Sequence, residues 1–187
     1  MATMISSGID VVNFLKEQHH QIRMAFVEVT NSRGKERQVA FYALRRLLAV
    51  HETAEEEVLH PVARKTLANG AIVVDARLRE ENYAKQALAE LEDLDVDSAT
   101  FEAKFAELQN KVTAHAHAEE RDEFEPLALQ LDQDRLDRMR KVVTFAESVA
   151  PTRPHPGVES MAANVLVGPF ASMVDRVRDA ISGKGRA

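Results

Sequence analysis

The sequence contains the same pair of side chains twice, each time inside a strongly helical run. His51 and Glu55 lie four residues apart in the segment HETAEEEVLHP, and His115 and Glu119 repeat this spacing in HAHAEERDEFEP. Residues four apart lie above one another on one face of an α-helix. The repeat therefore predicts two helices that each direct a histidine and a glutamate to one side, as two halves of one metal site.

Four long helices are predicted from stripes of residues spaced three and four apart, and each stripe carries polar side chains at inward positions. His20 and His117 are turned about 100° and 200° away from their inward neighbours, so neither is expected at the site. The stripes are Val12, Leu15, His19, Ile22, Phe26 and Val29; Phe41, Leu44, Leu48, His51, Glu55, Val58 and Val62; Val74, Leu78, Glu81, Lys85, Leu88 and Leu91; and Phe101, Phe105, Leu108, Val112, His115 and Glu119.

The breaks between helices are few, since the 187 residues include only 7 glycines and 6 prolines and no segment reads as a strand. Asp10 is expected to cap the first helix, and Pro61 to kink the second one turn past its metal pair. A fifth helix, from about Gln133 to Val149, should pack outside the bundle. We therefore predict an all-α protein, an antiparallel four-helix bundle with an additional C-terminal helix.

The segment PTRPHPG is expected to be a stiff linker, because each proline disfavours a helical conformation in the residue before it. It divides the chain into a helical domain at residues 1–150 and a proline-linked C-terminal tail at 151–187. Two short amphipathic segments in the tail suggest that it docks on the bundle or forms a contact with a second copy, giving a homo-oligomer.

Composition excludes several classes of protein. The chain has no cysteine, so disulfides, thiolate zinc sites and cysteine-ligated iron–sulfur clusters are ruled out. Its formal charge of −6, without a basic face that carries aromatic residues, argues against nucleic-acid binding. No secretion signal and no apolar stretch long enough to cross a membrane is present, so we expect a cytoplasmic protein.

Each polar position has a simpler interpretation when it is taken alone. A lone histidine on an apolar stripe is usually a hydrogen-bonded core residue, and Glu81 with Lys85 could form an ordinary ion pair on a solvated face. Their combination is harder to explain without a metal, because three buried, unpaired glutamates would cost several kcal/mol each. We predict that a pair of metal ions compensates this cost. The candidate ligands are His19, His51, Glu55, Glu81, His115 and Glu119.

These motifs resemble the hemerythrin-like, or HHE cation-binding, proteins. The resemblance rests on LKEQHHQIR, HETAEEEVLHP, EENYAK and HAHAEERDEFEP, and covers about residues 10–130. It implies a hemerythrin-like bundle with two non-haem iron ions joined by an oxo or hydroxo bridge, His19 as the first-helix ligand, and Glu55 and Glu119 as bridging carboxylates. The family's third-helix histidine falls on Glu81, which makes the site richer in carboxylates than that of the oxygen carriers.

Hard oxygen ligands favour the higher oxidation state of iron, which suits oxidative or peroxide chemistry better than repeated release of intact oxygen. The resemblance thus implies a di-iron protein that binds or reacts with oxygen, hydrogen peroxide or nitric oxide, with catalase-like or oxidase-like activity as one form of this. Two alternatives stay open. One is an iron-storage or redox- or iron-sensing protein without turnover, and the other is a metal-free helical interaction module.

Overall fold

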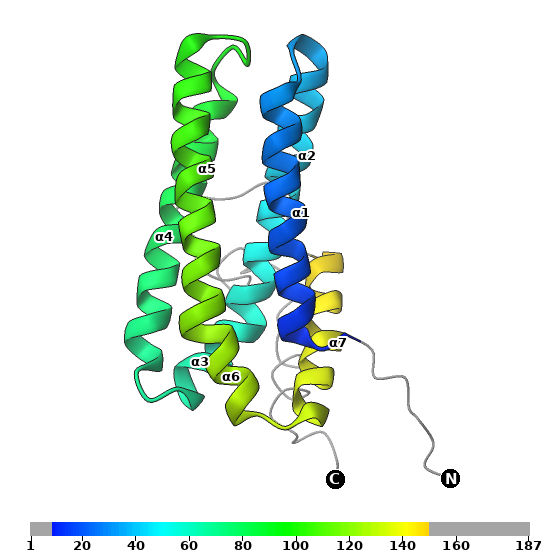
Figure 1. The fold of residues 1–187 in the computed structure, drawn as a ribbon, viewed down its shortest axis with the longest axis vertical. Helices are drawn as coiled ribbons and strands as arrows, with labels where there is room; N and C mark the ends of the chain where they lie inside the picture. The colour runs from blue at the N-terminus through cyan, green and yellow to red at the C-terminus, as the bar shows by residue number, and fades with distance from the viewer. Residues whose placement is uncertain (1–8, 150–187) are drawn as a thin grey trace, which may run out of the picture.

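The computed structural model of the protein describes residues 9–149, and within them it contains helices and no β-strand (Figure 1). The predicted all-α bundle with an extra C-terminal helix is confirmed. The tail at 151–187 and its proposed oligomer contact lie outside the described residues. In chain order the elements, where η marks a π-helix, are α1 (Val11–Asn31), α2 (Gly34–Ala54), η1 (Glu55–Leu59), α3 (His60–Thr66), α4 (Gly70–Glu92), α5 (Ala99–Glu119), η2 (Glu120–Phe124), α6 (Glu125–Gln130) and α7 (Gln133–Val149).

The bundle consists of two antiparallel hairpins, α1 with α2 and α4 with α5, whose turns lie at the same end (Figure 1). Arg37 joins the two turns. Its buried guanidinium donates hydrogen bonds to the carbonyl oxygens of Ser32 and Val96, at 2.8 Å each. The backbone N–H of Gly34, which has a positive φ of 56°, donates to the carboxylate of Asp97. This end of the bundle is thus held by polar contacts between the hairpins.

The predicted start of the first helix at Asp10 is confirmed, and α5 begins with a side-chain cap of the same kind. Asp10 accepts a hydrogen bond from the N–H of Asn13, and Ser98 accepts one from Phe101. The prediction for the second helix needs a correction, because the chain departs from α-helical geometry at Glu55 itself, in η1, rather than one turn later at Pro61. Pro61 stands in the first turn of α3, where its missing N–H is tolerated.

A polar layer divides the apolar core into two clusters. One lies towards the hairpin turns and contains Phe26, Phe41, Phe101 and Phe105. The other gathers the first turns of α1 with η1, α3, α6 and α7. On α1 the residue that separates them is His19, which stands between Leu15 of one cluster and Ile22 of the other. Stable apolar packing on both sides therefore fixes the height at which the polar side chains meet.

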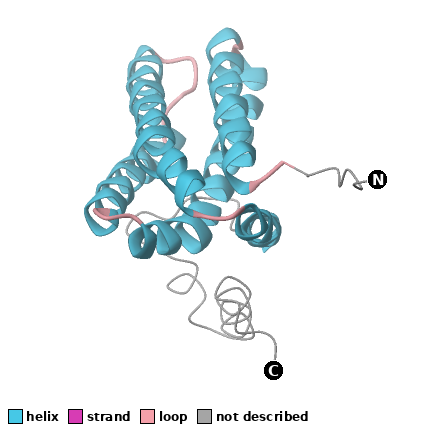
Figure 2. Cartoon of the chain, turned by 60° about the horizontal axis from the view of Figure 1, so that its bottom comes forward, coloured by secondary structure: helices cyan, strands magenta, loops and turns pink. Residues whose placement is uncertain are grey.

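The fifth helix, α7, lies beside α1, α2 and η1 and is seen almost end-on in Figure 2. Its residues Leu136, Met139, Val143 and Ala146 are buried in the second apolar cluster. It stands outside the four bundle helices, as predicted, and it closes the end of the core that lies opposite the hairpin turns.

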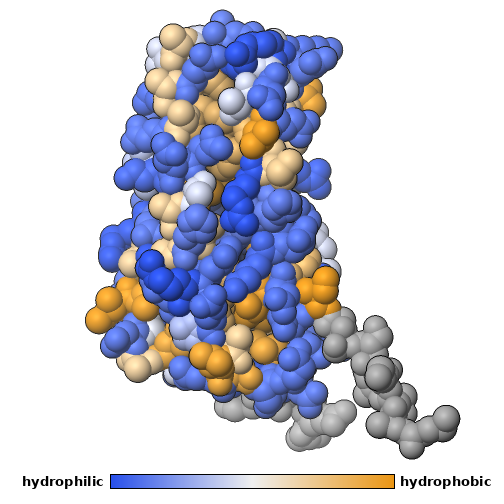
Figure 3. All heavy atoms as spheres, in the orientation of Figure 1, coloured by the Kyte–Doolittle hydropathy of each residue, from blue (hydrophilic) through white to orange (hydrophobic). Residues whose placement is uncertain are grey.

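The outer surface is mainly hydrophilic on the face shown in Figure 3, with isolated apolar side chains. Among the described residues, no helix is both long and apolar enough to span a membrane.

Candidate metal centre

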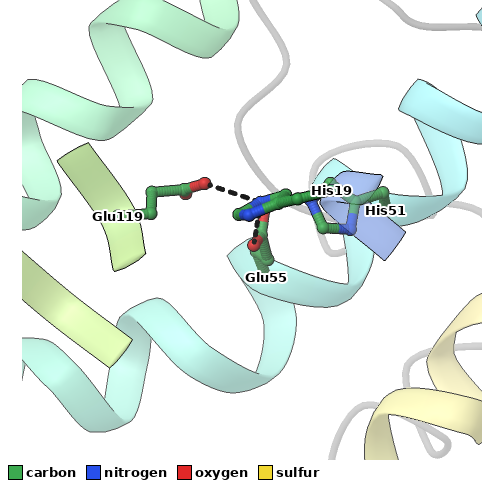
Figure 4. A group of neighbouring side chains, drawn as sticks. All are labelled: His19, His51, Glu55 and Glu119. Carbon is green, nitrogen blue, oxygen red and sulfur yellow. Dashed lines mark ion pairs between the residues drawn. The ribbon is translucent and has the colours of Figure 1, made fainter. Parts of the chain in front are cut away.

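Four of the predicted residues meet in the polar layer between the two apolar clusters (Figure 4). His19 comes from α1, His51 from α2, Glu55 from η1 and Glu119 from the end of α5. All four are buried, with Glu55 and Glu119 at 0% exposure. The fold therefore brings together His19 and Glu119, which are 100 positions apart in the sequence. Residues of both predicted His–Glu pairs meet in this group, in line with the prediction that the pairs are two halves of one site.

The donor atoms of this group face one another at distances suited to one shared ion. Nε2 of His19 lies 3.3 Å from Oε2 of Glu119 and 3.9 Å from Oε1 of Glu55, and Nε2 of His51 lies 3.3 Å from Oε2 of Glu55. Ligands bound to one first-row metal ion at roughly 2.1 Å are themselves about 3 to 4 Å apart. A metal ion among these atoms would need little rearrangement of the side chains.

Glu119 also belongs to a second group, with Glu81 of α4 and His115 of α5. Its Oε1 lies 3.2 Å from Nε2 of His115, whereas its Oε2 faces His19. The two oxygens of one buried carboxylate thus point to different histidines. All six predicted residues lie in these two groups, and Glu119 is the residue that the groups share.

The histidines are oriented by hydrogen bonds at Nδ1. This atom lies 2.8 Å from Glu120 in His19, 2.8 Å from Oε1 of Gln18 in His51, and 2.9 Å from Glu80 in His115. An acceptor at Nδ1 holds the proton there and leaves the lone pair of Nε2 free for a metal, which is how metal-binding histidines are commonly supported. The Nε2 atoms of all three have no hydrogen-bond partner among the described residues.

A hemerythrin HHE cation-binding domain model matches residues 10–127 of the sequence. The chain belongs to the hemerythrin HHE cation-binding domain family. Its fold is similar to that of a hemerythrin HHE cation-binding domain-containing protein from Mycobacterium kansasii, with a TM-score of 0.67 at 19% identity, over 75% of this chain and 86% of the other. A search of curated proteins finds no match.

This hemerythrin domain places two further buried residues beside the predicted set, His60 and Glu123. Nδ1 of His60 lies 2.8 Å from Oε1 of Glu123, and its Nε2 lies 2.7 Å from Oε1 of Glu81. Sequence periodicity missed His60 because five α-helical residues turn it about 140° away from Glu55. In η1 the N–H of His60 instead donates to the carbonyl of Glu55, five residues back, which returns His60 to the inward face. Glu123 continues the α5 stripe at i+4 from Glu119 and could have been found.

Glu81 and Lys85 form a contact, but it does not lie on a solvated face, so the alternative of an ordinary surface ion pair is wrong. Glu81 is 1% and Lys85 6% exposed, with Oε2 and Nζ 3.9 Å apart. Lys85 binds Glu56 more closely and lies 4.0 Å from Glu52. Glu81 therefore faces a lysine on one side and the metal-capable cluster on the other.

His20 and His117 are exposed, as predicted.

Burial and crowded charges perturb the protonation of the metal-free domain strongly. Burial lowers the pKa of His51 to about 3, and burial together with the charge of Glu119 raises the pKa of Glu55 well above 4.5. Burial would also lower the pKa of His115, but its contacts with Glu119 outweigh that effect and raise it well above 6.5. Without a metal, groups such as Glu55 and His115 thus retain protons, and a metal ion that binds these groups would displace the protons.

A cavity of about 420 Å³ adjoins the centre between the two hairpins. His19, His51, Glu81 and His115 contribute to its wall, which continues along apolar side chains such as Phe26 and Val112. The sequence had given no indication of this space. It is large enough for diatomic molecules and peroxide to reach the histidines, with room for a larger molecule.

Proposed function

We propose that this hemerythrin domain is a non-haem di-iron protein that binds or reacts with a small ligand such as oxygen, hydrogen peroxide or nitric oxide. The observation that carries the proposal is the position of Glu119, whose two oxygens face His19 and His115 separately. A carboxylate in this position can join two metal ions. Glu55, the second predicted bridging carboxylate, lies in only one of the two groups, so His19, His51 and Glu55 would hold one ion. Glu81 with His115 would hold the other.

The donor set supports iron over softer metals, because imidazole and carboxylate are ligands that non-haem iron proteins commonly use and the chain offers no thiolate. When bound, a pair of iron ions would supply electrons to a small oxidant, or accept them from a small reductant. The residues of the chain hold and orient these ions, and the apolar clusters on either side restrict the access of water. The cavity beside the histidines provides a route for the ligand.

A metal-free interaction module is disfavoured by the groups left unsatisfied in the core. Both oxygens of Glu55 and of Glu119 are buried and have no hydrogen-bond partner among residues 9–149. Buried polar atoms without partners are costly and uncommon in folded proteins. Bound cations would satisfy these atoms.

Elemental analysis of protein purified without chelator from iron-replete cells tests the proposal, together with stopped-flow spectroscopy of its reduced form. We expect close to two iron ions per chain and a change in near-ultraviolet charge-transfer absorption on mixing with at least one of the three ligands. His51→Ala should lose iron, and His117→Ala should retain it. Zinc alone, or no metal, would contradict the proposal, whereas iron without ligand reactivity would favour storage or sensing.

A further inference from the structure

Four histidines of the polar layer, of which His115 is partly buried and the other three are buried, share one arrangement, although the sequence predicted only three of the four at the centre. In each, Nδ1 lies within 2.9 Å of a side-chain oxygen, so that Nε2 is directed to a buried carboxylate. The pairs are His19 with Glu120, His51 with Gln18, His115 with Glu80, and His60 with Glu123.

His60 is as deeply buried as His19 and His51, with 2% exposure, and more deeply than His115. Its Nε2 lies 2.7 Å from Oε1 of Glu81, a hydrogen-bond distance slightly below the roughly 3 to 4 Å between two ligands of one ion, so the two side chains would separate slightly to share an ion. The donor atoms of His60, Glu119 and Glu123 lie within 4.8 Å of one another. His60 is therefore in contact with Glu81 and near Glu119, two residues of the second metal-capable group.

The carboxylates around His60 are not satisfied by it alone. The second oxygens of Glu81 and Glu123 are buried and without a hydrogen-bond partner among the described residues, and Glu123 is 0% exposed. A histidine that only linked two carboxylates would leave both of these oxygens unsatisfied. A cation next to His60 would neutralise them.

We infer that His60 is a fourth histidine ligand, which completes the second metal position with Glu81, His115 and Glu119, and that Glu123 is the residue that positions it. The inference rests on the proposed two-metal centre. It accounts for Glu81, since the histidine that the resemblance places on α4 is supplied here by the first residue of α3, directly after η1. It also balances charge, because the carboxylates of Glu55, Glu81, Glu119 and Glu123 match two divalent cations.

Anaerobic Fe²⁺ titration of the metal-free chain, followed by calorimetry, tests this assignment with His60→Gln, Glu123→Gln, His51→Gln and His117→Gln. The wild type should bind in two steps. His60→Gln should weaken one step by more than the roughly 10- to 100-fold expected for loss of an outer partner, and Glu123→Gln should weaken the same step by about that amount. His51→Gln should weaken the other step, and the exposed control His117→Gln should change neither.

Melting temperatures measured with and without Fe²⁺ separate a ligand from a structural bridge. If His60 binds metal, His60→Gln reduces the rise in melting temperature that Fe²⁺ causes. If His60 only bridges Glu81 and Glu123, His60→Gln lowers the melting temperatures of the metal-free and metal-loaded forms equally, and both binding steps remain. That result would overturn the assignment. If His60→Gln does not fold, the binding steps of Glu123→Gln and its rise in melting temperature with Fe²⁺ distinguish a metal ligand from a structural bridge in the same way. A wild type that shows a single step or none would refute the two-metal proposal itself, and the assignment of His60 with it.

Discussion

Gln18 and His51 are joined by a hydrogen bond of 2.8 Å in the interior of the bundle, between Oε1 of the amide and Nδ1 of the imidazole. The amide nitrogen of Gln18 donates in turn to the carboxylate of Glu147, on α7. The helix outside the four-helix bundle is thereby connected to a candidate metal ligand through one intermediate side chain.

The substitution Gln18→Leu should weaken iron binding because it removes the acceptor that holds the proton of His51 at Nδ1. Loss of such an outer partner typically costs roughly 10- to 100-fold in metal affinity. Competition titration with a coloured chelator measures the effect. Gln21→Leu, at an exposed position of the same helix, is the control. Equal affinities for the two variants would show that this hydrogen bond does not support the centre.

Glu81 and Lys85 should respond differently to truncation, although they are neighbours on α4. Glu81→Ala removes a proposed ligand and should lower iron content and shift the iron spectrum. Lys85→Met should leave iron content near that of the wild type but destabilise the fold by on the order of 3 kcal/mol, because Glu56 would lose its buried partner. Denaturant unfolding and elemental analysis of both variants test this. The same iron loss in both would place Lys85 among the groups that the centre requires.

The metal-free protein should lose stability as the pH rises above 6.5. The stability that His115 gains from its raised pKa is fully present below 6.5 and is lost as the pH rises through the folded-state value. Glu52 acts in the same direction, because burial raises its pKa to about 8, so the folded state keeps a proton that the unfolded state releases above 4.5. The pKa of His51 is lowered to about 3, so His51 makes the folded state more stable as the pH rises, but only below pH 6.5.

Thermal unfolding with a chelator present should therefore show a loss of more than about 1 kcal/mol between pH 6.5 and roughly pH 9. Iron affinity should change in the opposite direction, since His19 and His115, whose pKa values are raised, must release protons before they bind metal. A metal-free stability that is flat or increases over this range would contradict the protonation pattern.

Removal of iron should lower the melting temperature, because a metal that binds only the folded state adds its binding free energy to stability. At a thousandfold excess over the dissociation constant the gain is about 4 kcal/mol per site, or roughly 10 °C for a domain of this size. Differential scanning calorimetry before and after chelation measures it. An unchanged melting temperature would mean that the buried acidic residues do not share a metal.

The helical stripes predicted both the fold and the layer of the bundle in which the six residues lie. Apolar clusters on both sides of this layer fix the position of His19, His51 and Glu119 along the bundle axis. His60 could not be predicted in the same way, since its inward position depends on the π-helical turn at Glu55–Leu59 and not on a 3.6-residue period. The role of Gln18 was also hidden, because its partners come from α2 and α7.

We propose that Glu119 joins two iron ions, and a crystal structure with anomalous scattering measured at the iron edge is the sharpest test of this arrangement. We predict two peaks about 3.5 to 4 Å apart, as in other two-metal sites. One should lie beside His19, His51 and Glu55 and the other beside Glu81 and His115, with one oxygen of Glu119 directed to each. A single peak, or two peaks that do not flank Glu119, would show that Glu119 does not join two iron ions.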